Sequence, residues 1–127
     1  MITITKELIK AHDYESAINL IFNLNKIYEY SRLQYNWNGN GAEPYTPEVI
    51  DLAWSHLMKI EKQPEVFPPA IGAIQFEWEK ENGDYLDFEI YADRIELFMI
   101  VGGAELEQNL STDADLNWIV NEFWEES

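Results

Sequence analysis

The chain has 127 residues and a formal net charge of −16, with 24 acidic residues against eight Lys and Arg. It contains no cysteine, which excludes disulfides, thiolate nucleophiles and cysteine-ligated zinc. Hydrophobic residues make up 46% of the chain and are spread along it, so the composition predicts one folded domain over residues 1–127.

The N-terminal stretch, MITITKELIKAHD, shows no targeting signal. It has neither a long apolar run nor a small-residue cleavage pattern. No segment of the chain reaches the ~18 apolar residues that span a bilayer. We therefore expect a soluble, cytoplasmic protein.

The first predicted helix begins at Asp13, a residue that can serve as its N-cap, and runs to about Leu33. Apolar residues at helical spacing place Ala17, Ile18, Phe22 and Leu24 on its apolar face. Asn23 lies on the side expected to face water.

A loop over residues 36–44 separates this helix from a second one. Its Asn-Gly pairs and proline are turn signals, and it lacks the lysine and the preceding strand that a phosphate-binding loop requires. Thr46 and Pro47 are typical of the N-cap and first residue of a helix, which ends near Lys62. His56 falls on the apolar stripe of this helix, where a packed, hydrogen-bonded imidazole is expected rather than a catalytic one.

The second half of the chain has the pattern of a sheet. Residues 63–70 contain three prolines and are predicted as an extended connector. From Ile74 onward apolar and polar residues alternate with a period of two, which indicates half-buried strands. Strands are expected over residues 74–79, 85–91 and 94–101, with a weaker fourth strand over 104–108.

The turns between these strands follow from the requirement that all strands share one apolar face. A three-residue loop at 81–83, with Gly83 in the left-handed conformation, pairs Trp78 with Leu86. Two-residue loops at 92–93 and 102–103 keep the same phase. The predicted sheet therefore has hydrophobic side chains on one face and carboxylates on the other.

A last helix is predicted after residues 111–115, because Leu116, Val120 and Phe123 recur at helical spacing behind capping residues. The expected fold class is α+β. It comprises a three- or four-stranded antiparallel meander sheet with two N-terminal helices and one C-terminal helix packed on one face.

Acidic residues are concentrated in this second half, where residues 75–127 carry fifteen acids and only two bases. The predicted register places Glu77 opposite Asp87 and Glu89 opposite Glu96, and such like-charged pairs destabilise a sheet by up to about 1 kcal/mol each. A face that keeps them is a candidate partner-binding surface. Its residues are Glu77, Glu79, Tyr85, Asp87, Glu89, Tyr91, Glu96, Phe98, Glu105 and Glu107.

This surface predicts a non-enzymatic protein that occupies a basic surface of a partner protein. Apolar groups among the acids would supply affinity, and the carboxylates would steer the encounter. Antitoxins, immunity proteins and inhibitors of nucleic-acid-binding enzymes act in this way. A more specific form of this hypothesis is a phage protein that mimics DNA and acts against host defence. Phosphate backbones and anionic lipids would be repelled, so no direct binding of nucleic acid or membranes is expected.

Three alternatives stay open from the sequence. The acidic face can be a solvated surface that only keeps the protein soluble. The carboxylates can serve a small metal-dependent enzyme, although no D-x-D-x-D-G loop is present and we expect no catalytic residue, metal or other cofactor. Finally, Phe98 and Ile100 can form the contact of a structural homodimer.

The loop Trp37-x-Gly39-x-Gly41-Ala42 and the segment Gly72-x-Ile74-x-x-Glu77-Trp78 carry a resemblance. In their spacing, and in the prolines between them, residues 37–90 resemble a widespread group of small bacterial proteins without a known activity. The resemblance implies the order of helices before strands and a bacterial or phage origin. It implies no chemistry.

Overall fold

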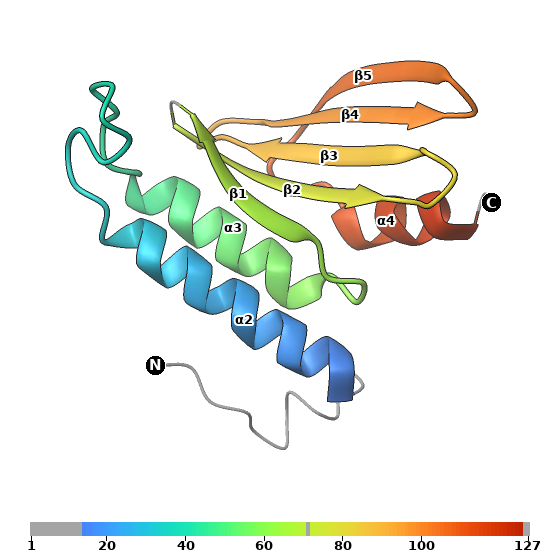
Figure 1. Ribbon diagram of the computed structural model, residues 1–127, viewed down its shortest axis with the longest axis horizontal. Helices are drawn as coiled ribbons and strands as arrows, with labels where there is room; N and C mark the ends of the chain where they lie inside the picture. The colour runs from blue at the N-terminus through green and yellow to red at the C-terminus, as the bar shows by residue number, and fades with distance from the viewer. Residues whose placement is uncertain (1–13, 71, 126–127) are drawn as a thin grey trace.

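The computed structural model describes residues 14–70 and 72–125 (Figure 1). The helices are α2 (Tyr14–Ser31), α3 (Pro47–Lys59) and α4 (Leu116–Glu125), and the strands are β1 (Glu65–Ala70), β2 (Ala73–Glu79), β3 (Tyr85–Ile90), β4 (Ile95–Val101) and β5 (Ala104–Leu110). The strands form one antiparallel sheet in chain order, and these helices pack on one side of it. The predicted α+β class is confirmed.

Within the described residues the sheet has five strands, one more than the largest number predicted. The additional strand is β1, which occupies the segment expected to be an extended connector. Val66 pairs with Phe76 of β2, and the pairing shifts between Phe67 and Ala70, where Pro68 and Pro69 lie. Prolines are tolerated here because β1 is an edge strand and its irregular end needs fewer backbone donors.

The predicted register of the three hairpins is confirmed. Trp78 pairs with Leu86, and β4 follows in the same phase with Ile90 opposite Ile95. The first turn is a three-residue loop closed by a 2.8 Å hydrogen bond from the Lys80 amide to the Asp84 carbonyl. Gly83 in that loop has a φ of 92°, the left-handed conformation that glycine adopts without a steric penalty.

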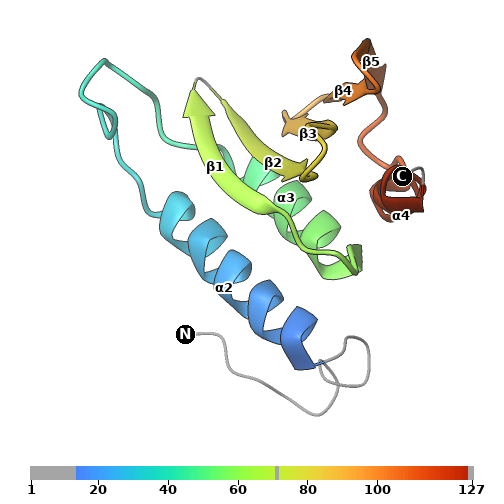
Figure 2. The same cartoon turned by 45° about the vertical axis from the view of Figure 1, so that its right-hand side comes forward.

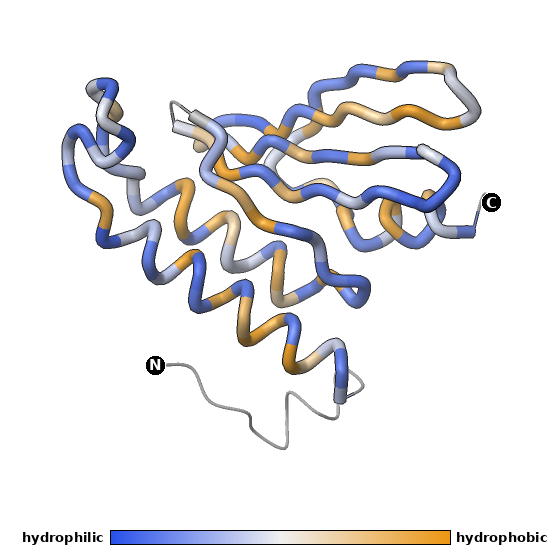
Figure 3. The backbone as a smooth tube through the Cα atoms, in the orientation of Figure 1, coloured by the Kyte–Doolittle hydropathy of each residue, from blue (hydrophilic) through white to orange (hydrophobic). Residues whose placement is uncertain are grey.

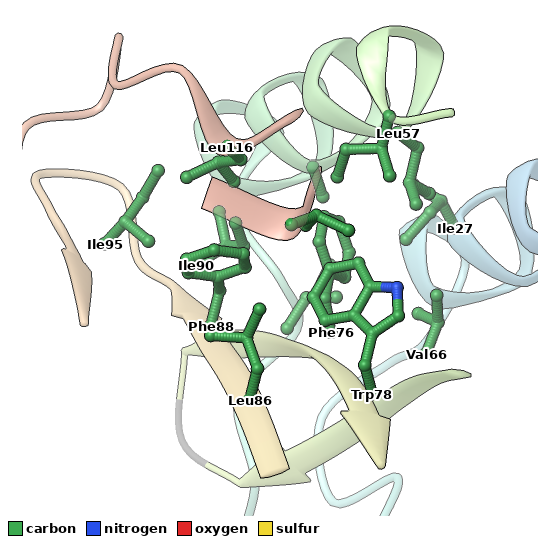
Figure 4. Close-up of a cluster of buried hydrophobic side chains, with 14 of the residues drawn as sticks. Ile27, Leu57, Val66, Phe76, Trp78, Leu86, Phe88, Ile90, Ile95 and Leu116 are labelled. Carbon is green, nitrogen blue, oxygen red and sulfur yellow. The ribbon is translucent and has the colours of Figure 1, made fainter. Parts of the chain in front are cut away.

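One hydrophobic core joins the sheet to the helices. Figure 3 shows hydrophobic and hydrophilic residues alternating along β2, β3 and β4, and the hydrophobic set points at the helices in Figure 4. Phe76 and Phe88 are completely buried, and Leu57 of α3 and Leu116 of α4 cover them from the helical side. The large hydrophobic core side chains occupy alternate positions of β2 and β3, and the side chains between them lie on the opposite face of the sheet.

The buried face of α2 agrees with the prediction in part. Ala17 and Leu24 are buried as predicted, and Leu20 and Ile27 also enter the core, whereas Ile18 and Phe22 are exposed. Asn23, expected to face water, is buried because its side-chain amide donates hydrogen bonds of 3.0 Å to the Gln63 side chain and the Pro64 carbonyl. The predicted N-cap, Asp13, lies outside the described residues.

The second helix begins as predicted, with Thr46 as its N-cap and Pro47 as its first residue. His56 is buried on its inner face, and its Nε2 lies 2.8 Å from the carbonyl oxygen of Thr112. Burial lowers the pKa of His56, which favours the neutral imidazole that donates this bond. The packed, hydrogen-bonded imidazole expected at this position is confirmed.

Candidate binding surface

The ten residues predicted to form the binding surface lie on one side of the sheet, opposite the core. The pairings Glu77–Asp87, Glu89–Glu96 and Phe98–Glu107 run across β2 to β5 and hold these side chains on a common face. Within residues 14–70 and 72–125, α3 and α4 pack on the other side. We refer to this side as the acidic face.

The middle of the acidic face is hollowed between β3, β4 and β5. The hollow has a volume of about 320 Å³ and opens to solvent. Four predicted carboxylates and Phe98 contribute to it, together with polar groups of β5 that the prediction did not include. Its lining is Asp87, Glu89, Glu96, Leu97, Phe98, Glu107, Gln108 and Asn109.

At one side of the hollow, the hydroxyl of Tyr85 lies between two carboxylates. Its oxygen is 2.8 Å from Oε2 of Glu77 and 2.9 Å from Oδ2 of Asp87. Gln75, which the sequence did not single out, donates from Nε2 to the same Glu77 oxygen at 3.1 Å. One face of the sheet thus carries a connected polar cluster of four side chains from β2 and β3.

The Tyr85 hydroxyl has one proton and two carboxyl oxygens within hydrogen-bond distance. It donates fully to one acceptor at a time, so the second carboxyl group is either an ionised group held close to the hydroxyl or, when protonated, a donor to its oxygen. Asp87 is the more buried, with 8% of its surface exposed. Burial raises the pKa of Asp87 to about 6; the hydrogen bond from Tyr85 opposes this shift, and the charges of Glu89 and Glu77 add to it. Below about pH 6 a protonated Asp87 can therefore donate to Tyr85, which donates to Glu77, whereas above that pH both carboxylates are charged beside the hydroxyl.

In the second like-charged pair, Glu89 and Glu96, each carboxylate accepts a hydrogen bond from a donor of its own. Oε2 of Glu96 accepts a 2.7 Å hydrogen bond from Nε of Arg94, and Oε2 of Glu89 accepts one of 2.9 Å from the Tyr91 hydroxyl. The Arg94 guanidinium also lies 4.0 Å from the centre of the Tyr91 ring. Repulsion across the pair is thus offset by one cation and one hydroxyl, so it is smaller than the sequence alone implies.

Arg94 also belongs to the acidic face, although the predicted set of residues did not include it. Its position two residues before Glu96 on a strand puts both side chains on the same face, and that spacing was the available signal. Gln108 and Asn109 carried no such signal, because a hollow depends on the curvature of the sheet. Glu79 and Glu105, by contrast, belong to the acidic face but do not line the hollow.

The described part of the chain offers no metal centre and no membrane span. No group of three or more His, Asp or Glu side chains within residues 14–70 and 72–125 is placed to hold a metal ion. None of the helices found there is both long and apolar enough to cross a bilayer.

No protein-family model, curated protein or solved structure matches the chain. The resemblance to the small bacterial group therefore stays a prediction. A functional proposal must rest on the acidic face itself.

Proposed function

We propose that the protein binds a basic surface of another protein through its acidic face, as antitoxins, immunity proteins and enzyme inhibitors do. The observation that carries the proposal is the gathering of carboxylates from three adjacent strands, β3, β4 and β5, around one hollow, with the side chain of Phe98 among them. Such a surface attracts lysine and arginine side chains over several ångströms and offers apolar contact area once they arrive.

The desolvation cost of burying a carboxyl group on the acidic face supports a binding role. The Glu77, Asp87 and Tyr85 cluster buries a carboxyl group whose ionised form has no cation against it among the described contacts. A lysine or arginine from a partner would supply that cation and favour ionisation of Asp87. A face that serves only solubility gains nothing from a buried carboxyl group, since exposed carboxylates perform that task without the desolvation cost.

The partner class that fits best is a nucleic-acid-binding protein. Carboxylates on alternate residues of one strand lie about 7 Å apart, and those on neighbouring strands about 5 Å apart, a spacing that can imitate a row of phosphates. Under this version the protein competes with DNA or RNA for its partner. It would act as an inhibitor and require neither cofactor nor catalysis.

Capture from lysate of the source organism tests the proposal. The tagged wild-type chain is compared with Glu89→Lys/Glu96→Lys, after nuclease treatment of the lysate, and captured proteins are identified by mass spectrometry. The proposal expects a basic protein that the wild type retains at low salt, releases at high salt and does not retain in the double variant. Adding DNA to the purified pair should displace it if the mimicry is correct.

The matched control is Glu43→Lys/Asp51→Lys, which changes the net charge equally at two exposed positions in the loop before α3 and on α3. Melting temperatures of both double variants establish that they are folded. Equal capture by the wild type and Glu89→Lys/Glu96→Lys, or equal loss in both double variants, would contradict the proposal.

A further inference from the structure

The two edge strands of the sheet, β1 and β5, differ in what covers them. The β1 edge is closed by α2, since Lys26 Nζ and the Tyr30 hydroxyl both donate to the Val66 carbonyl oxygen, at 3.3 and 3.4 Å. Figures 1 and 2 show β5 at the other edge, on the side of the sheet away from α2. In β5 every residue from Ala104 to Asn109 is exposed.

The outward backbone groups of β5 can be assigned from its turn. Gly102 and Gly103 form a two-residue loop with positive φ, so Val101 and Ala104 are a hydrogen-bonded pair and bonding alternates from there. Leu106 and Gln108 then bond toward β4. The amides and carbonyls of Glu105, Glu107 and Asn109 point away from the sheet.

Those outward positions are also acidic. The side chains of Glu105 and Glu107 stand on the acidic face, beside the hollow to which Glu107 and Asn109 contribute. On the opposite face of the same strand Leu106 is 49% exposed and lies opposite Met99. The edge thus presents carboxylates on one side, an apolar side chain on the other, and outward-pointing backbone groups between them.

We propose that β5 accepts an extended, basic segment of the partner as a sixth, antiparallel strand. This inference rests on the proposed function and specifies how the partner docks. Residues of the added strand opposite Glu105, Glu107 and Asn109 form the hydrogen-bonded pairs and place their side chains over the acidic face, where lysine or arginine fits. The residues between them lie beside Leu106, where apolar side chains fit.

Charge decides against a second copy of this chain as the occupant. Two β5 strands paired antiparallel would bring Glu105 and Glu107 of both copies together on one face, with no base on either strand. Charged residues on edge strands hinder this self-pairing in natural sheets. The same glutamates favour a basic strand, so they select the partner.

The test uses a short peptide of alternating lysine and valine in two methylated forms. N-methylation of the lysines removes the amides that would bond to β5, whereas N-methylation of the valines alters only amides on the far edge. Both forms have the same charge and composition. The proposal expects binding of the lysine-methylated form to be about tenfold weaker or worse, because two or three hydrogen bonds are lost.

The position of binding is read from amide exchange in the complex with the valine-methylated peptide. The amides of Glu105, Glu107 and Asn109 should become protected, and Glu107→Pro should weaken binding more than Glu107→Gln. Proline removes one outward donor, which an edge strand tolerates, whereas glutamine removes only the charge. Thermal melting confirms that both variants are folded.

Equal binding of the two methylated peptides would overturn the edge inference. If Glu89→Lys/Glu96→Lys still abolished capture of the partner, the acidic face would remain the binding surface and only the mode of docking would be wrong. A dimer of the free chain that Glu107→Pro dissociates would also overturn it, with a second copy as the occupant.

Discussion

The hydroxyl of Tyr85 lies 2.9 Å from Oδ2 of Asp87 while it also contacts Glu77, so the face proposed to attract cations holds a buried carboxyl group that takes up a proton below about pH 6. Such an arrangement links folding to pH. In the unfolded chain an aspartic acid titrates near pH 4, whereas the pKa of Asp87 in the fold is about 6. The folded state therefore binds the proton more tightly, and this site loses stability as pH rises from about 4 to 6.

Asp87→Asn should consequently stabilise the protein near neutral pH. Asparagine is uncharged at every pH and its amide can donate to the Tyr85 oxygen as the protonated acid does. We expect a gain of about 1–3 kcal/mol at pH 7.5 and little change at pH 3, which lies below both pKa values, measured by urea unfolding. Comparison with the wild type at each pH cancels other titrating groups such as His56. An equal gain at both pH values would show that Asp87 is ionised throughout.

Tyr85→Phe should destabilise the fold near neutral pH. It removes the donor to Glu77 and leaves Asp87 buried without its hydroxyl partner, a change that costs about 1–3 kcal/mol. Tyr91→Phe is the matched control, because the Tyr91 hydroxyl has one carboxylate partner, Glu89, and that residue is less buried than Asp87. Chemical unfolding of the two variants at pH 7.5 should rank Tyr85→Phe as clearly less stable. Equal losses would mean that the bridging role of Tyr85 contributes nothing.

The pattern of the sequence predicted most of the sheet because its period of two matches the pleat. It did not predict β1, since Pro68 and Pro69 argue against a strand unless that strand is known to be at an edge. The prediction of the buried face of α2 was wrong in part, for a different reason. Asn23 finds its partners in Gln63 and Pro64, a contact between distant parts of the chain that helical periodicity cannot contain.

The acidic face was likewise predictable from the sequence only in part. The facing of Glu77 and Asp87 followed from turn lengths and was predictable. The sharing of one tyrosine hydroxyl between them depends on side-chain rotamers, and the hollow depends on sheet curvature. Neither property is encoded in spacing along the chain.

Lys80 offers a test of how the hairpin is held to the C-terminal helix. Its ammonium group is buried, donates to the Phe123 carbonyl oxygen and lies 4.5 Å from the centre of the Phe123 ring. A cation near a helix C-terminus is favoured by the helix dipole. Lys80→Met keeps the aliphatic stem but should lower the free energy of unfolding by about 1–3 kcal/mol. Lys59→Met, at an exposed position, should change it by less than about 0.5 kcal/mol, and equal effects would contradict this assignment.

The most direct test of the central claim is a hydrogen-exchange footprint of the purified complex with the captured partner. Binding through the acidic face should protect peptides that span β3, β4 and β5, with the strongest protection in β5, and leave α2 and α3 unchanged. Protection confined to α2 and α3, with β3 to β5 exchanging as in the free protein, would contradict the claim.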